Sequence, residues 1–432
     1  MATPQVNRQA SSRREFLRQT TSAAVATTAA VGAFGVPLVI ADERVKGANE
    51  RPGIGFIGVG GRSQAHMDIC NRLKKEGRCD TVAVCDIYQP RAAAAAQKTG
   101  GKIYRNHHEL LADPRVDAVC IATPDRHHAP QAIDAIRAGK DVYCEKPLTH
   151  WTQMDLARQV GEAAEKHHRI VQVGTQFVAD DAYVEIRKLI KDGVIGKVVH
   201  AQVGYFRRSD LGERMPIPNP NAKPGPALDW EAFLGDAPKR PFDISRFFQW
   251  RLYWDYAGGP ATDLLVHSFT PIFCLLELGY PERVMGGGGM FQYNHHREVP
   301  DQCNIIADYA GGPSIVMMNS LSNFTGIETM IRGTDGIIIF GGIDNPKVMG
   351  PKGIRIVPVA KGAKEIQIAW KGAGDTNRLW ENFFDCIKSR QRPYSPIDIA
   401  VRVQAPLNMG ILSYRENKVA RWDKENKKIV LT

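Results

Sequence analysis

Three side chains in two short stretches have the types and spacing needed for proton transfer. Lys146 lies in the stretch Cys144 to Pro147, "CEKP", which follows an apolar, strand-like run. Asp263 and His267 are four positions apart in "YAGGPATDLLVHSF", so on a helix they share one face. A surface lysine and an ordinary i,i+4 ion pair are the simpler interpretations. The glycine-rich entry and the neighbouring aromatic segment 250–256 nevertheless favour the wall of an active site.

A glycine-rich turn earlier in the chain is typical of a dinucleotide site. The strand-like run "IGFIGVG" leads into Gly58-Val59-Gly60-Gly61-Arg62-Ser63, and a helical pattern follows. Glycines let the backbone approach a pyrophosphate, whose charge is met by N–H groups at the start of the helix. Asp86 ends the next apolar run, "TVAVCD", where a carboxylate can bind an adenosine ribose. The carboxylate favours NAD over NADP, although Arg62 and Arg91 could accommodate a ribose phosphate.

These residues need a parallel sheet to bring them together, and the first half of the chain predicts one. Short apolar runs alternate with helical patterns from Ile54 to about Gly174, as in a doubly wound sheet that is covered on both faces. Such sheets bind ligands at the carboxyl ends of their strands, where Lys146 is also expected. We therefore assign residues 53–174 to a Rossmann nucleotide-binding domain of the α/β class.

The second half, residues 175–432, has a different pattern. A strand-like run, "GKVVHAQVGYF", precedes a long, aromatic-rich loop at 209–249 that contains seven prolines. Six strand-like runs from "CNIIADYA" to "IQIAW" are separated by short turns, which predicts a largely antiparallel sheet. Helices are predicted at 182–191, 261–278, 376–389 and 397–414. This half is therefore expected to form an α+β domain.

The composition is that of a globular protein and argues against several partners. Of 432 residues, 43% are hydrophobic and 24% are charged, and the formal net charge is +10. The basic residues are scattered, so we expect no nucleic-acid partner. The eight cysteines lack metal-ligand spacing, and Cys85, Cys120 and Cys144 lie in apolar runs typical of buried strands. We expect buried thiols, no metal site, and histidine pairs at the surface or at helix ends.

The first 41 residues are typical of a signal for Tat export. Ser12 to Arg18, "SRREFLR", has two adjacent arginines followed by Phe-Leu, ahead of a weakly apolar run that ends at Ala41. A basic, disordered tail is the alternative interpretation. The run is rich in Ala, Thr and Gly and contains Pro37, which disfavours a membrane-spanning anchor. We expect cleavage after Ala41, a linker at 42–52, and a protein that the Tat translocon exports to the periplasm.

Five stretches together resemble the Gfo/Idh/MocA oxidoreductase family. They are "GVGGRS", "AVCD", "ATPDRHHA", "AIRAGKDVYCEKPL" and "GGPATDLLVH". The resemblance implies that the second domain has a large, open, mostly antiparallel sheet, which often mediates homo-oligomer contacts. It also implies Lys146, Asp263 and His267 as the catalytic set. On the cofactor side it implies Gly58, Gly60, Gly61, Arg62, Asp86, Thr123, Pro124, His128 and Glu145.

On this resemblance we expect an enzyme that oxidises a hydroxyl of a sugar, polyol or glycoside with NAD, or alternatively NADP. His267, with an ordinary pKa of about 6.5, would accept the hydroxyl proton. Lys146 would stabilise the alkoxide, and Asp263 would orient the imidazole or bind a neighbouring hydroxyl. Arg208, Arg251 and Trp254 are candidate substrate-binding residues. The aromatic residues of segment 247–254 would either stack on a sugar or hold the loop against the rest of the protein.

Two other functions fit the same residues. Tat export carries folded proteins, so the cofactor is expected to be bound before export and retained. A retained cofactor would serve net oxidoreduction, and it would equally serve an NAD-dependent glycosidase that oxidises the sugar ring transiently before elimination. A non-catalytic sugar-binding protein on the same fold is the third alternative.

Overall fold

The computed structural model describes most of the chain. The described residues are 51–208, 215–293, 296–341, 353–369 and 376–432. The predicted signal at 1–41 lies outside them, as does the predicted linker apart from its last two residues. None of the helices within the described ranges combines the length and apolar character needed to cross a membrane.

The first lobe is a Rossmann domain, as predicted. Its six parallel strands have the order β3-β2-β1-β4-β5-β6. The strands are β1 (Gly53–Ile57), β2 (Asp80–Cys85), β3 (Lys102–Tyr104), β4 (Ala118–Ile121), β5 (Asp141–Cys144) and β6 (Val171–Val173). The helices between them are α2 (Gly61–Lys75), α3 (Gln89–Thr99), α4 (His107–Ala112), α5 (Asp125–Arg137) and α6 (Met154–Lys166). Every residue of β1, β4 and β5 is buried, which explains their continuous apolar sequences.

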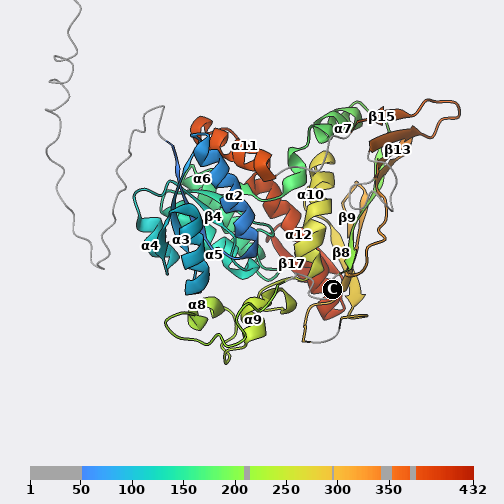
Figure 1. The fold of residues 1–432 in the computed structure, drawn as a ribbon. Coiled ribbons are helices and arrows are strands. Elements are labelled where there is room, and N and C mark those ends of the chain that lie inside the picture. Colours follow the sequence, from blue (N-terminus) through green and yellow to red (C-terminus); the bar gives the residue numbers. More distant parts are fainter. Residues whose placement is uncertain (1–50, 209–214, 294–295, 342–352, 370–375) are drawn as a thin grey trace, which may run out of the picture. The chain divides into compact units, whose positions relative to one another are not determined.

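One face of this sheet is completed by a helix from the end of the chain. Helix α11 (Thr376–Ser389) lies beside α2 (Figure 1). The Trp380 ring stacks on Tyr143 of β5 with 4.4 Å between ring centroids, and Phe383 and Phe384 join the same hydrophobic cluster. The first lobe therefore uses residues from both ends of the described chain.

The second lobe is built on a mixed, mostly antiparallel sheet, as expected. Its eleven strands include the path β15-β14-β13-β12-β7-β10-β9-β8-β16-β17, and β11 pairs with β7. Among the described strands of this second sheet, only β7 and β10 pair in parallel. The strands are β7 (Val198–Arg208), β8 (Arg283–Gly289), β9 (Gln302–Asp308), β10 (Ser314–Ser320), β11 (Ser322–Asn323), β12 (Thr329–Gly333), β13 (Gly336–Gly341), β14 (Gly353–Pro358), β15 (Ile366–Ile368), β16 (Ala420–Asp423) and β17 (Lys428–Leu431).

Three helices accompany this sheet. They are α7 (Asp181–Lys191), α10 (Val266–Leu275) and α12 (Ile397–Glu416). Helix α12 contacts both α6 of the first lobe and β8 of the second, so it joins the two lobes (Figure 1). The helix predicted at 261–278 begins as a π-helical turn, Ala261–Leu265, and continues as α10. Such turns widen the helix and are frequent at functional sites.

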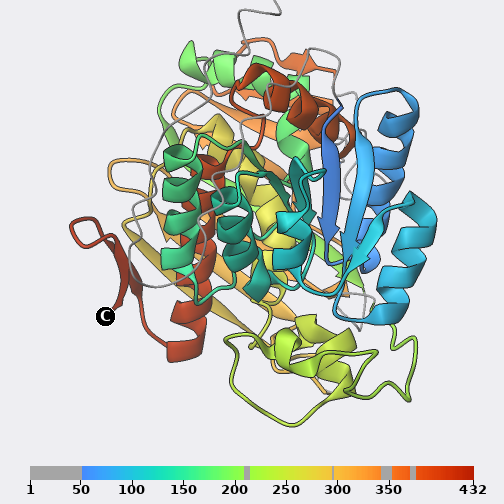
Figure 2. The same cartoon turned by 90° about the vertical axis from the view of Figure 1, so that its left-hand side faces the viewer.

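The segment predicted as a long loop contains short helices and a core of its own. We call residues 215–257 the cap segment; it includes α8 (Trp230–Leu234) and α9 (Ile244–Phe248), which form a separate layer alongside the first lobe (Figures 1 and 2). Its aromatic side chains pack around Tyr88, from the loop after β2. The backbone N–H of Gln89 donates to the carbonyl of Ala227 over 2.9 Å. The cap segment is therefore fixed on the edge of the sheet where ligands bind.

Candidate active site

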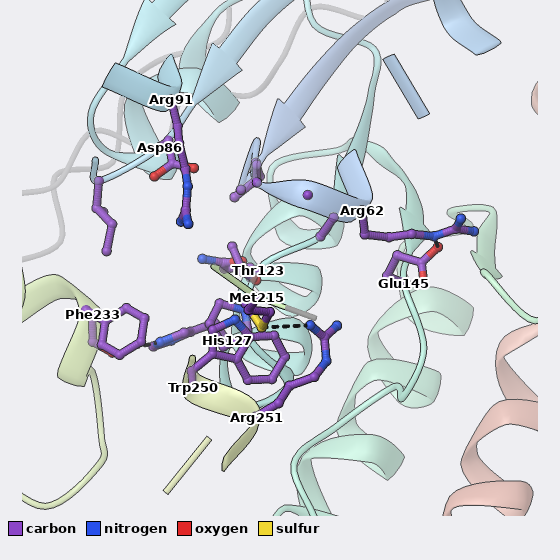
Figure 3. Close-up of a pocket in the computed structure, with 18 of the residues that line it drawn as sticks. Arg62, Asp86, Arg91, Thr123, His127, Glu145, Met215, Phe233, Trp250 and Arg251 are labelled. Carbon is purple, nitrogen blue, oxygen red and sulfur yellow. Dashed lines mark hydrogen bonds and ion pairs between the residues drawn. The ribbon is translucent and has the colours of Figure 1, made fainter. Parts of the chain in front are cut away.

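A cavity of about 880 Å³ opens at the carboxyl ends of the Rossmann strands (Figure 3). Loops of the first lobe, the cap segment, β7 and the π-helical turn all contribute to its wall. Of the fifteen residues assigned from the sequence to catalysis, cofactor binding or substrate binding, twelve line it, and Arg91 lines it too; the twelve are Gly58, Gly60, Gly61, Arg62, Asp86, Thr123, Pro124, Glu145, Lys146, Arg251, Asp263 and His267. Its volume is within the range of ligand sites, which is roughly 300–1,000 Å³.

The glycine turn has the backbone needed for a close ligand approach. Gly58 has a φ of 78°, and a Cβ there would lie 2.6 Å from Cγ2 and 2.8 Å from the backbone nitrogen of Thr123. A Cβ on Gly60 would meet nothing closer than the Arg91 guanidinium at 3.9 Å. Helix α2 starts at Gly61 without a side-chain cap and without an acidic residue in its first turn. Its N–H groups are therefore suited to a pyrophosphate, so this part of the cavity fits NAD.

Asp86 lies at the end of β2, as predicted, and its carboxylate faces the same cavity. Its oxygens accept hydrogen bonds from the backbone N–H groups of Val59, at 3.0 Å, and Tyr88, at 2.9 Å. Burial raises the pKa of this carboxyl above its usual value. A carboxylate can accept about four hydrogen bonds, so acceptor positions are left for ribose hydroxyls.

Glu145 is held in a buried polar network, of which Figure 3 shows the contact with Arg62. Its Oε1 atom accepts hydrogen bonds from Nε of Arg62, at 2.9 Å, and from Nε2 of His66, at 2.8 Å. The indole of Trp380 donates to Nδ1 of His66, which assigns the imidazole proton to Nε2. Burial alone would raise the pKa of Glu145, but Arg62 and His66 hold it well below its usual range. Glu145 is therefore ionised and fixed directly beside Lys146.

Lys146 and Asp263 are joined across the two lobes. The Lys146 ammonium donates to Oδ1 of Asp263, at 2.8 Å, and to its backbone carbonyl, at 2.6 Å. Nε of Arg251 lies 3.3 Å from Oδ1, and Nη2 of Arg207 lies 3.8 Å from Oδ2. Burial would raise the pKa of Asp263, but Lys146 first, then Arg251 and Arg207, hold it below its usual value. Asp263 is therefore a carboxylate bordered by three cations.

His267 lies one helical turn beyond Asp263, also in the cavity wall. Its ring is 6.1 Å from that of Tyr205 on β7, centroid to centroid. Burial, and then the nearby Lys146 ammonium, lower the pKa of His267 to about 3. The prediction of an ordinary pKa is therefore wrong for this environment. The imidazole is neutral at pH 7, which is the state that can accept a proton.

Three predicted residues lie elsewhere. His128 is buried beneath the wall, with its ring nitrogens 2.6 Å from the Pro147 carbonyl and 2.8 Å from that of Thr123. Trp254 packs edge-on against Trp151, with 5.7 Å between the ring centroids, and is absent from the cavity wall. Arg208 is exposed, because successive side chains of a strand point to opposite faces and Arg207 takes the inward position.

Several wall residues were missed by the sequence analysis. They are Tyr205 and Arg207 on β7 and Met215 and Phe233 of the cap segment, among others, whereas Trp250 belongs to the aromatic segment that was predicted at the wall. The pair on β7 could have been found from its spacing of two in a strand-like run. The cap residues follow no regular period. Phe247 and Phe248 are almost fully buried among the aromatic residues of the cap segment, so they hold the segment in place.

One group of described side chains has the geometry for a metal ion, although no metal site was predicted. One ligand atom each of His107, His108 and Asp134 lie within 4.8 Å of one another. Nε2 of His107 is 3.0 Å from Oδ2 of Asp134, so a hydrogen bond already explains this contact. Both histidines line the cavity.

The fold and the cavity together define a nucleotide-dependent oxidoreductase with an NAD-binding Rossmann domain. Residues 53–175 match the family model described as "Oxidoreductase family, NAD-binding Rossmann fold". Residues 180–432 match the model "Oxidoreductase family, C-terminal alpha/beta domain". The chain belongs to the Gfo/Idh/MocA oxidoreductase family.

Curated relatives include inositol 2-dehydrogenases. The protein of Rubrobacter xylanophilus is 30% identical over 205 residues, 47% of this chain and 54% of the relative. That of Gluconacetobacter diazotrophicus is 31% identical over 235 residues, 52% of this chain and 63% of the relative. The chain thus spans about half the length of the curated relatives it matches.

Solved structures share the fold at low identity. The WlbA dehydrogenase of Bordetella pertussis, in complex with NADH and UDP-GlcNAcA, has a TM-score of 0.64 and 18% identity, covering 86% of this chain and 98% of its own. The aldose-aldose oxidoreductase of Caulobacter crescentus, complexed with glycerol, has a TM-score of 0.63 and 18% identity, covering 86% and 100%. At this identity the likeness concerns the fold alone.

Proposed function

We propose that this protein oxidises a hydroxyl-bearing carbon of a sugar, polyol or glycoside. The observation that carries the proposal is the position of Lys146, Asp263 and His267 in the wall of the same cavity as the glycine turn and Asp86. The inositol 2-dehydrogenases among the relatives support a polyhydroxylated substrate. When bound, NAD would supply the hydride acceptor. The glycine turn would hold its pyrophosphate and Asp86 its adenosine ribose.

The chain's own residues would manage the proton and the charge. His267 is neutral, so its imidazole would accept the hydroxyl proton. The Lys146 ammonium has three N–H donors and directs hydrogen bonds at two oxygens of Asp263. Its third donor would stabilise the developing alkoxide. Asp263 would thus orient Lys146, to which it is bonded, rather than the imidazole.

The cap segment supports a tightly held cofactor. It contacts the loop after β2 through Asp229, whose N–H donates to the carbonyl of Ile87 over 3.1 Å. It also contacts α5, where Nε2 of His127 is 2.9 Å from the carbonyl of Phe233. Because residues of the cap segment line the same cavity as the glycine turn, these contacts would slow the release of a bound dinucleotide. Mass spectrometry of the purified protein should detect bound nicotinamide cofactor, whereas cofactor-free protein would contradict retention.

A substrate panel tests the proposed reaction. The purified protein is incubated with inositols, aldoses and glycosides, and reduced nicotinamide is followed by absorbance. Reduction with at least one sugar or polyol is expected, and its loss in the Lys146→Ala variant would assign it to this site. Release of phenol from aryl glycosides without added NAD would instead favour the glycosidase alternative. Saturable sugar binding without any turnover would favour a non-catalytic sugar-binding protein.

We also propose export by the Tat pathway. The proposal rests on the twin-arginine stretch Ser12 to Arg18 and the small residues that end at Ala41. Expression of the full chain should yield a periplasmic form whose first residue is Asp42. The Arg13→Lys, Arg14→Lys double variant should remain in the cytoplasm. An intact amino terminus on the periplasmic form would overturn the cleavage site, and cytoplasmic retention of the unaltered chain would overturn export.

A further inference from the structure

The catalytic end of the cavity carries more positive than negative charge. Lys146, Arg251 and Arg207 approach the same carboxylate, that of Asp263, to 2.8, 3.3 and 3.8 Å. All four side chains line the cavity. One carboxylate balances only one of the three cations. A surplus of about two positive charges therefore faces the space where a substrate would lie.

The neighbouring carboxyl groups do not remove this surplus. Glu145 is ionised, but it is already paired with Arg62 at 2.9 Å. Asp125 is 2% exposed, and burial raises its pKa to about 8 despite the nearby Arg251. It is therefore mostly uncharged at pH 7. Among the described residues around Asp263, no further carboxylate is available to balance the two arginines.

Each of the two arginines also has an N–H donor that lacks a strong acceptor among the described residues. Nε of Arg207 is buried and has no hydrogen-bond partner within the described part of the chain. Nη1 of Arg251 donates to Sδ of Met215 at 3.3 Å, and a thioether is a weak acceptor (Figure 3). The Arg251 guanidinium lies over the Trp250 ring, 4.2 Å from its centroid, which holds it in place. Such a guanidinium is suited to a carboxylate, which it can bind through two parallel hydrogen bonds.

We propose that the substrate is an acidic sugar, a uronic or aldonic acid or its glycoside, whose carboxylate binds to Arg207 and Arg251 beside the oxidised carbon. This inference rests on the proposed function and specifies its substrate class. The carboxylate of such a substrate would be the second one near Arg207 and Arg251, and it would balance positive charge that Asp263 alone leaves unbalanced. Neutral sugars would leave the guanidinium donors desolvated without acceptors, which is costly in a buried site.

The first experiment compares galacturonate with galactose, and gluconate with glucitol, on the protein as purified. The KM for each acid should be at least about tenfold lower than for its neutral counterpart, because charge-assisted hydrogen bonds contribute about 1.5–3 kcal/mol each. The KM of the acids should also rise with ionic strength, and that of the neutral compounds should not. Equal KM values with neutral sugars at both ionic strengths would overturn the inference and leave the oxidoreductase proposal intact. A preference for sugar phosphates over both would overturn the carboxylate assignment.

The second experiment uses variants and a binding measurement that does not need turnover. Calorimetry on the NADH-loaded protein should show that Arg251→Gln and Arg207→Gln weaken galacturonate binding about 10- to 100-fold while affecting galactose little. Arg251→Lys, which keeps the charge but loses the paired donors, should be intermediate. Arg208→Gln, on the outward face of the same strand, is the matched control and should bind as the unaltered protein does.

The outcomes separate the two proposals. Binding of galacturonate that depends on both arginines, but without turnover of any sugar, would support the charge assignment and overturn the oxidoreductase proposal. Equal losses for galactose and galacturonate in Arg251→Gln and Arg207→Gln would show a structural role and overturn the inference. Intermediate galacturonate binding by Arg251→Lys, which retains the cation, would show that the loss in Arg251→Gln comes from a lost contact and not from misfolding.

Discussion

The indole Nε1 of Trp380 donates a hydrogen bond to Nδ1 of His66 over 2.9 Å, and both side chains are fully buried. This contact links α11 to α2, which are far apart in the sequence. It leaves the proton of the imidazole on Nε2, where it is donated to Glu145. Helix α11 therefore determines which nitrogen of His66 carries the proton that is donated to Glu145, the residue next to Lys146.

Trp380→Phe tests this link. The variant keeps an aromatic ring against Tyr143 but leaves Nδ1 of His66 buried without its donor. The free energy of unfolding should fall by about 1–3 kcal/mol from the lost hydrogen bond alone, measured by urea denaturation. Trp422→Phe is the control, since Trp422 stacks on Tyr280 in the second lobe. An equal loss of stability in both variants would show that ring size, not the hydrogen bond, matters.

Gly58→Ala should disrupt the cofactor site. A Cβ there would lie 2.8 Å from the backbone nitrogen of Thr123, and its φ of 78° adds about 1–2 kcal/mol of strain for a non-glycine residue. Calorimetric titration should show NAD affinity reduced by about tenfold or more. Gly161→Ala in α6 is the control, because its Cβ would meet nothing closer than 3.9 Å. Unchanged NAD affinity in Gly58→Ala would argue against the glycine turn as the pyrophosphate site.

Lys146→Ala should separate chemistry from cofactor binding. The substitution removes the donor proposed for the alkoxide, while Arg251 and Arg207 still border Asp263. We expect kcat to fall about 100- to 1,000-fold with NAD affinity nearly unchanged. The measurement needs steady-state kinetics together with an NAD titration of the same preparation. Turnover at the original rate would exclude Lys146 from the reaction.

The pH dependence of activity should lack an ordinary histidine titration. The pKa of His267 is lowered to about 3, so the imidazole stays neutral from pH 8 down to pH 5. A plot of kcat/KM against pH should therefore show no decrease on the acid side with an apparent pKa of about 6.5 that can be assigned to His267. If such a decrease with an apparent pKa near 6.5 is present in the unaltered protein and absent in His267→Asn, the imidazole of His267 has an ordinary pKa and the prediction is wrong.

Stability should fall in mild acid for a related reason. His150 is 0% exposed, with Nε2 2.7 Å from the Trp254 carbonyl, and burial lowers its pKa to about 3. Between that value and the unfolded pKa of about 6.5, the unfolded chain binds more protons than the folded one, so stability falls as pH falls. This histidine alone should cost about 2 kcal/mol between pH 7 and pH 5. Urea denaturation at both pH values should show a smaller decrease for His150→Gln.

The sequence predicted the framework of the site well because local patterns encode it. The glycine turn, Asp86 and Lys146 each follow an apolar run. In a parallel sheet the carboxyl ends of the strands lie at the same edge, so these residues come together. Helix α11 was predicted at 376–389 and occupies those residues. Its position against the first sheet was not predictable, because an amphipathic period does not specify which surface a helix covers.

The errors arose where orientation or environment decides the outcome. Choosing Arg208 over Arg207 required knowing which face of β7 points inward. Trp254 was grouped with Trp250, although the chain turns between them and only Trp250 reaches the cavity. The pKa of His267 depends on burial and on Lys146, which lies far away in the sequence. These properties emerge only when both lobes and the cap segment are packed together.

The place of α11 has a consequence for synthesis of the chain on the ribosome. Tyr143 is translated long before Trp380, yet the two rings stack with 4.4 Å between their centroids in the finished protein. During synthesis, the first lobe therefore exposes the apolar surface around Tyr143 until almost the whole polypeptide has emerged and α11 can pack on it. Pulse proteolysis of stalled nascent chains should find this lobe cleavable when translation halts after β7 and resistant once α12 is out. Resistance already at the earlier stall would mean that the lobe closes without its final helix.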